Sequence, residues 1–218
     1  MMDVSERVTE LLKEYPLLHK EAESDKQIKL SGDIKVHRSI EQYVINRTYS
    51  IEIYVPMTVE DLPYVVYTGN AINNKYPHMY KDGKLCLATD IDMRLAFRED
   101  ASLAKWMKDF VEPFFVIYEY YERYGYYPSG DRAHGAKGIV QSYMEIFDVT
   151  EKQASHIMLF MWKNRYRGHQ PCPCGSGERI RNCHGKRLLE FYNDPVLFDQ
   201  VRKDCDSLVQ ELNSYNRK

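Results

Sequence analysis

The chain has 218 residues, a formal net charge of −2 and a mean hydropathy of −0.56. The near-neutral charge argues against a protein whose main role is to coat nucleic acid, and no segment approaches the roughly 20 apolar residues of a membrane helix. The first residues lack the basic start and apolar run of a secretory signal. Five cysteines, three of them clustered with a histidine, favour metal binding and free thiols over a disulfide framework. We therefore expect a soluble, cytoplasmic protein.

The predicted elements begin with one helix and continue with strands. Apolar residues at helical spacing predict a helix from Ser5 to about Lys20, with Ser5 as its N-cap. Alternating apolar and polar residues predict strands over 27–36 and 49–55, and residues 64–67 form a third candidate strand. This order of elements is typical of an α+β fold and not of alternating βαβ units.

Helices dominate the rest of the prediction. Acidic residues at 99–100 open a helix that runs to Phe110, and Pro113 is expected to kink it or to begin a new one. The helical spacing of apolar residues also predicts helices over 138–147 and 150–162. A last helix begins at Asn193-Asp194-Pro195, with Cys205 as a packed thiol on its apolar stripe.

The stretch Tyr76–Ala88 sets one cysteine, Cys86, in an apolar frame just after a predicted Asp-Gly turn. Thiols attack as thiolates, so a reactive cysteine needs nearby cationic or hydrogen-bonding groups. The nearby candidates are His78, Lys81 and Lys84. The alternative is that Cys86 is a small buried hydrophobe between two leucines.

This stretch resembles the active-site segment of ubiquitin-conjugating enzymes, in which His-Pro-Asn precedes a short variable run, Gly, one residue, an aliphatic residue and Cys-Leu. The matching residues are Pro77, Gly83, Leu85, Cys86 and Leu87, whereas Tyr76 and His78 stand where that family has histidine and asparagine. The resemblance implies that Cys86 forms a thioester and that His78 replaces the asparagine as oxyanion donor, or acts as a base. In this hypothesis the Tyr76 side chain supports His78. The order of elements over about residues 4–120 also resembles this family.

A second motif lies between Pro171 and Gly185. Two pairs of candidate ligands, Cys-x-Cys and Cys-His, are separated by eight residues, a pattern that can close a tetrahedral shell around Zn²⁺. The ligands are Cys172, Cys174, Cys183 and His184. The motif resembles the zinc motif at the C-terminus of the SecA translocation ATPase. A closed shell leaves no position for water, so we expect a structural zinc ion.

Basic residues surround this motif. They are Lys163, Arg165, Arg167, Arg179, Arg181, Lys186 and Arg187. Such a collar is compatible with a solvated face, an acidic protein or nucleic acid. Because the whole chain is nearly neutral, we expect a protein partner and neither nucleic acid nor a membrane.

Together these features predict an α+β, ubiquitin-conjugating-like domain over 1–165, a SecA-type zinc motif over 166–190 and a C-terminal helix over 191–218. The resemblance to ubiquitin-conjugating enzymes implies a transferase, which carries the C-terminus of a protein as a thioester on Cys86 and passes it to a target amine. Similar bacterial proteins are encoded in anti-phage CBASS operons beside a cGAS-like nucleotidyltransferase, which the resemblance implies as the carried protein. No ATP-binding glycine loop is visible, so either another protein activates the carboxyl group or the enzyme starts from a substrate that is already activated.

The sequence is also compatible with two alternative functions. The first is a non-catalytic adaptor that binds a protein partner through the same fold and the zinc motif. The second is a cysteine hydrolase that uses Cys86 with His78 or His134, for which the sequence offers no orienting acid.

Overall fold

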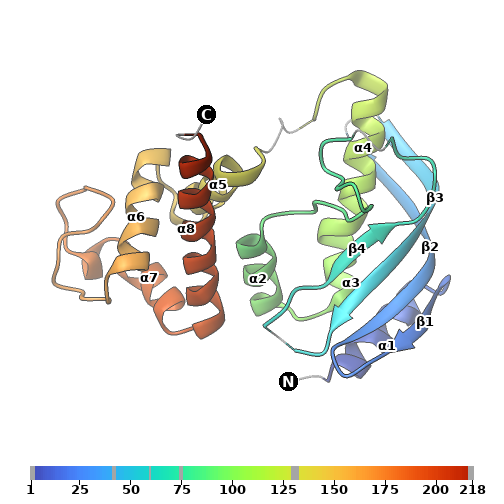
Figure 1. Ribbon diagram of the computed structural model, residues 1–218, viewed down its shortest axis with the longest axis horizontal. Coiled ribbons are helices and arrows are strands. Elements are labelled where there is room, and N and C mark those ends of the chain that lie inside the picture. Colours follow the sequence, from blue (N-terminus) through green and yellow to red (C-terminus); the bar gives the residue numbers. More distant parts are fainter. Residues whose placement is uncertain (1–2, 41–42, 59, 74–75, 129–132, 216–218) are drawn as a thin grey trace. The chain divides into compact units, whose positions relative to one another are not determined.

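The structure is a computed structural model that describes residues 3–40, 43–58, 60–73, 76–128 and 133–215, without the side chains of Leu212, Ser214 and Tyr215 (Figure 1). It is an α+β protein with a four-stranded antiparallel sheet and helices. The chain divides into two compact units, residues 1–88 with 96–131 and residues 89–95 with 132–218.

The sheet of the first unit is a meander. Its strands are β1 (Leu18–Glu23), β2 (Gln27–Ile40), β3 (Tyr43–Pro56) and β4 (Tyr64–Tyr67), and each pairs antiparallel with the next. The longest pairing runs from Gln27 opposite Pro56 to Ile40 opposite Tyr43. Alternate side chains of β2 and β3 are buried, as the period of two predicts.

The first helix is shorter than predicted. The structure ends α1 (Val4–Glu14) before Pro16, and its N-cap is Asp3 in a capping box with Glu6, not Ser5. The following residues, Leu18–Glu23, form β1 because they pair with β2. The predicted helix to Lys20 is therefore wrong beyond Glu14, since pairing with β2 overrides the weak helical pattern of this segment.

Helices complete the first unit after the sheet. A short helix, α3 (Leu103–Trp106), continues through a π-helical turn, η1 (Met107–Val111), into α4 (Glu112–Tyr124). Pro113 lies in the first turn of α4, directly after the π-helical turn. The backbone stays helical through residues 103–124, so Pro113 stands where the hydrogen-bonding pattern of the helix changes and does not begin a separate helix. Figure 1 shows α4 lying across one face of the sheet.

Two glutamates seven residues apart join α4 to β2, β3 and the end of α1. The carboxylate of Glu112 accepts hydrogen bonds from Tyr15 Oη and Arg38 Nε, both at 2.6 Å. Glu119 accepts from Arg47 Nη1 at 2.5 Å and Tyr49 Oη at 2.8 Å. A spacing of seven returns to the same helix face, so both carboxylates meet the sheet.

The second unit is helical. It contains the first residues of α2 (Asp90–Glu99), then α5 (Gly135–Phe147), α6 (Glu151–Lys163), a 3₁₀ turn η2 (Ile180–Asn182), α7 (Gly185–Tyr192) and α8 (Pro195–Tyr215). Sequence patterns missed α2, whereas α5, α6 and α8 lie close to their predicted positions. Cys205 is buried on α8, as predicted.

A buried polar chain crosses this helical unit. Tyr143 Oη donates to Asp204 Oδ2 at 2.8 Å, Gln200 Nε2 donates to Asp204 Oδ1 at 2.8 Å, and Arg94 Nε donates to Gln200 Oε1 at 2.9 Å. Burial raises the pKa of Asp204 to about 6, although hydrogen bonds from Gln200 and Tyr143 act in the opposite direction.

The units do not follow the expected boundaries at residues 165 and 190. Cys172, Cys174 and Ile180 of the predicted zinc motif belong to one buried cluster with Phe191 and Val201. The motif and the last helix are therefore parts of the same packed unit as α5 and α6. Buried contacts between segments far apart in sequence, which local composition does not reveal, set this division.

Candidate functional site

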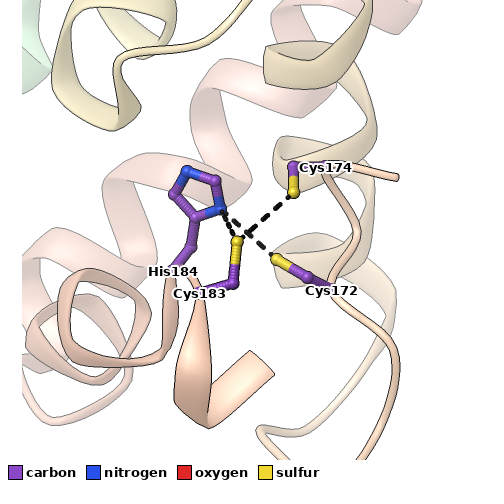
Figure 2. Close-up of side chains that lie close together, drawn as sticks. All are labelled: Cys172, Cys174, Cys183 and His184. Carbon is purple, nitrogen blue, oxygen red and sulfur yellow. Dashed lines mark hydrogen bonds between the residues drawn. The ribbon is translucent and has the colours of Figure 1, made fainter. Parts of the chain in front are cut away.

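Four metal-binding side chains converge in the second unit (Figure 2). The ligand atoms of Cys172, Cys174, Cys183 and His184 all lie within 4.8 Å of one another. Cys172 Sγ and Cys183 Sγ lie 3.3 Å and 3.2 Å from His184 Nδ1, and the sulfurs of Cys174 and Cys183 are 3.6 Å apart. The sequence prediction that these four residues meet is confirmed, and the cluster can hold a metal ion.

Backbone hydrogen bonds position the first two ligands. The amide of Cys172 donates to the carbonyl of Glu178 at 2.8 Å, and the amide of Gly175 donates to the carbonyl of Cys172 at 3.0 Å. Cys183 follows η2, and His184 stands at the N-terminus of α7. Cys172 and Cys174 are buried, whereas Cys183 is exposed.

Contacts from α5 and α6 hold the cluster in place. His184 Nε2 lies 3.1 Å from the carbonyl oxygen of Phe147, so Nε2 carries the proton and Nδ1 offers its lone pair to the cluster. Gln153 Nε2 donates to the carbonyl of Cys174 at 2.9 Å. No local pattern predicts these two contacts, because Phe147 and Gln153 lie on helices outside the motif.

The thiols differ in acidity. Burial raises the pKa of Cys172 to about 11. Burial also acts to raise the pKa of Cys174, but hydrogen bonds with Ser176, Cys172 and Cys183 lower it to about 6. A metal ion that binds here must displace the proton of Cys172, so binding releases protons.

The Cys86 loop lies in the first unit beside the edge of the sheet. Tyr67 N donates to the Gly83 carbonyl and Leu85 N to the Val65 carbonyl, both at 2.9 Å. Leu85 is buried and fastens the loop to the core. The loop therefore continues the hydrogen bonding of β4 and fixes the backbone on which Cys86 stands.

Cys86 and His78 are neighbours. The amide of Cys86 donates to the carbonyl of His78 at 2.7 Å, and Cys86 Sγ lies within 4.8 Å of a His78 ring nitrogen. The Cys86 side chain is half-buried, which leaves part of it accessible. The structure thus brings together the two residues that the sequence singled out.

Aromatic rings surround His78. Tyr127 meets it edge-on with ring centroids 5.4 Å apart, and Tyr76 lies at 5.6 Å. Tyr76 is buried and also contacts the rings of Phe114 and Tyr118 on α4. Tyr76 is thus a core residue that supports His78.

His134 belongs to the second unit, where it is the N-cap residue of α5. The predicted loop that carries His134 also holds Asp131, a further candidate base or substrate-positioning group for Cys86, and Asp131 lies outside the described residues.

Comparisons with family models, with curated proteins and with solved structures find no match for this chain. None of the helices in the part of the chain that the structure describes combines the length and the apolar character needed to cross a bilayer.

Proposed function

We propose that the protein is a ubiquitin-conjugating-like acyltransferase that carries the C-terminus of a protein as a thioester on Cys86 and transfers it to a target amine. The observation that carries this proposal is the pairing of a half-buried Cys86 with the His78 imidazole on a loop fastened to the sheet edge. The order of helix, four-stranded meander, cysteine loop and following helices supports a ubiquitin-conjugating-like fold.

The reaction has two steps. In the first, the Cys86 thiolate attacks the activated carboxyl carbon of the incoming protein, a C–S bond forms and the activating group leaves. In the second, the target amine attacks the thioester carbonyl, a C–N bond forms and the C–S bond breaks. The His78 imidazole donates a hydrogen bond to the transient oxyanion or takes the proton that the amine releases.

The carried protein in this proposal is a cGAS-like nucleotidyltransferase, and the setting is bacterial anti-phage defence of the CBASS type in the cytoplasm. Because the sequence shows no ATP-binding glycine loop, a second protein supplies the activated C-terminus in this proposal. The family resemblance of the Cys86 segment supports this assignment by analogy alone.

We further propose that the metal in the Cys172–His184 cluster is Zn²⁺ with a structural role. A tetrahedral zinc ion with ordinary bond lengths separates two sulfurs by about 3.8 Å and a sulfur from a nitrogen by about 3.5 Å. The observed separations of 3.6 Å for Cys174–Cys183 and of 3.2 and 3.3 Å to His184 support this fit. Three thiolates and one imidazole fill the shell, so no position remains for a reacting water.

The acyl-carrier proposal is tested by co-expressing the protein with its genomic neighbours and comparing wild type with Cys86→Ser on a non-reducing gel. Wild type is expected to form a thiol-sensitive adduct, and the serine variant a hydroxylamine-labile ester whose cargo mass spectrometry identifies. Cys205→Ser is the matched control, because Cys205 is a buried thiol on α8. It should retain the adduct.

A third variant, His78→Ala, separates carriage from transfer. If His78 acts on the second step, this variant keeps the Cys86 adduct but loses most conjugation to amines. Absence of any adduct while a neighbour still co-purifies would support the non-catalytic adaptor instead. Release of free product without transfer to an amine would identify a cysteine hydrolase.

A further inference from the structure

The segment Lys163–Arg187, called here the basic segment, concentrates positive charge. It contains seven lysine and arginine side chains and one carboxylate, Glu178, which gives it a formal charge of +6. The whole chain has a formal net charge of −2, so the remaining residues carry −8. A Zn²⁺ ion held by three thiolates adds only −1 to the segment. The charge of the whole chain therefore conceals a strongly basic region.

Six of these seven cations have no ion-pair partner among the residues that the structure describes. Arg187 pairs with Glu190 at 2.5 Å. Among the residues that the structure describes, no carboxylate lies within ion-pair distance of the other six, Lys163, Arg165, Arg167, Arg179, Arg181 and Lys186. All six are exposed. An external anion can bind such a side chain without breaking an internal ion pair.

Local folding gathers three of the arginines. The amide of Ile180 donates to the Gln170 carbonyl at 2.9 Å, and the amide of Arg181 donates to the Gly168 carbonyl at 3.1 Å. Ile180 is fully buried between the exposed Arg179 and Arg181. The chain around Arg167 is thus paired with the chain that carries Arg179 and Arg181. In Figure 1 the connection between α6 and α7 extends beyond the two helices.

The composition of this surface favours phosphate over protein. Protein interfaces take most of their affinity from large apolar anchors, with charges at the rim. The large hydrophobic side chains that are exposed in the described chain all lie outside residues 163–187. Phosphate backbones need only distributed cations, and the planar guanidinium group binds phosphate oxygens in pairs.

We propose that the basic segment binds the phosphate backbone of nucleic acid without reading its sequence. This function is independent of acyl transfer at Cys86, because all of its residues belong to the metal-bearing unit. A protein partner was expected because the net charge of the whole chain is close to neutral. That net charge is a sum over all residues, so it does not reveal the positive charge of the basic segment.

The test is fluorescence anisotropy with the full-length, zinc-loaded protein and two labelled probes, a 20-nucleotide oligo(dT) strand and a 20-base-pair mixed-sequence duplex. Binding should weaken with salt, and for about four phosphate contacts the duplex affinity should fall about 100-fold between 50 and 200 mM salt. The two probes distinguish single-stranded from duplex nucleic acid as the source of the phosphates.

A charge-matched pair of variants locates the surface. Arg167→Gln, Arg179→Gln and Arg181→Gln together should reduce the salt slope on duplex by about 3, because each lost phosphate contact removes about one. The control combines Lys13→Gln, Lys26→Gln and Lys152→Gln, which removes the same charge from exposed positions elsewhere. It should leave affinity and slope unchanged. The metal content of both variants, measured by mass spectrometry, verifies that the segment remains folded.

Three results would overturn the proposal. One is the absence of any anisotropy change up to about 100 μM protein, the weak limit of non-specific binding. Another is an equal loss in both triple variants, which would assign binding to overall charge. The third is displacement of the probe by poly-glutamate as effectively as by unlabelled DNA, which would identify an acidic protein as the partner.

Discussion

The two cysteine-bearing loops of this protein are held in place by different means. The loop with Cys86 is fixed by backbone hydrogen bonds to β4 and by the buried side chain of Leu85. In the loop with Cys172 and Cys183, four side chains converge within 4.8 Å. The first loop depends on a sheet assembled from distant segments, whereas the second brings together four side chains that can hold a metal ion.

This difference separates two ways of building a site. A metal cluster concentrates its stabilising free energy in a few ligands, so removal of one ligand should dismantle the loop. A loop supported by a core spreads the same task over many weak contacts, so single substitutions there should have smaller effects. Four measurements address this contrast, from the largest expected effect to the smallest.

The largest effect is expected from Cys172→Ser. Loss of this buried ligand should abolish stoichiometric metal binding and lower the free energy of unfolding of the second unit by at least about 4 kcal/mol. Metal analysis and thermal unfolding measure both quantities. Cys205→Ala, which removes another buried thiol of the same core, should keep the metal and cost about 1 kcal/mol. Retention of full metal by Cys172→Ser would contradict the cluster assignment.

A smaller effect is expected in the first unit from Glu119→Ala. The variant leaves the buried Tyr49 hydroxyl without its acceptor, whereas Arg47, with 57% of its side chain exposed, is rehydrated. The free energy of unfolding should fall by about 2–4 kcal/mol, as measured by urea denaturation. Glu122→Ala, an exposed glutamate on the same helix, should change it by less than about 0.5 kcal/mol. Equal losses of unfolding free energy in the two variants would show that the change in helix propensity, and not the loss of the buried contact, determines the result.

The buried Asp204 should give the second unit a distinctive pH dependence. Burial raises the pKa of this carboxyl group in the folded state to about 6, from an ordinary value of 3.8. The folded state therefore binds the proton more tightly, and this contribution to stability grows as pH falls through about 6 and is complete below the unfolded value. Between pH 7 and about 4.5 it amounts to about 2 kcal/mol.

Comparison with Asp204→Asn isolates that contribution, because metal loss in acid affects both proteins alike. The difference in the free energy of unfolding, wild type minus variant, should increase by about 2 kcal/mol when the pH falls from 7 to about 4.5. Urea denaturation at several pH values measures it. A difference that stays constant with pH would mean that Asp204 titrates normally in the folded protein.

The smallest effect concerns the turn before Cys86. Gly83 has φ +82°, and a Cβ atom there would lie 2.9 Å from the Tyr67 carbonyl oxygen. Gly125 has φ +76° with no atom within 4 Å of a Cβ. Both alanine variants should cost about 1 kcal/mol for the left-handed backbone, and Gly83→Ala about 1 kcal/mol more for the contact. Denaturation curves measure the free energy of unfolding of both variants. Equal costs would show that the turn at Gly83 relaxes to avoid the contact with the Tyr67 carbonyl oxygen.

The fold was predictable where local signals were strong. The alternation in β2 and β3, the Thr150 cap of α6 and the proline that begins α8 gave the positions of these elements. Residues 18–23 and 90–99 were missed, because β1 depends on pairing with β2 and α2 has only a short, weakly amphipathic pattern. Local periodicity cannot report a partner that lies elsewhere in the chain.

The candidate sites show the same division between features that a short segment predicts and features that depend on distant parts of the chain. By itself the sequence predicted the four-residue cluster, since ligand type and spacing allow Cys172, Cys174, Cys183 and His184 to close one shell around a metal ion. It also contained the charge of the basic segment. Only the tertiary structure decided that Phe147 and Gln153 support the cluster and that Glu119 lies under the sheet. It also decided that no described carboxylate pairs with six of the basic side chains. Ligand spacing is a property of a short segment, whereas burial and pairing depend on what the rest of the chain brings alongside.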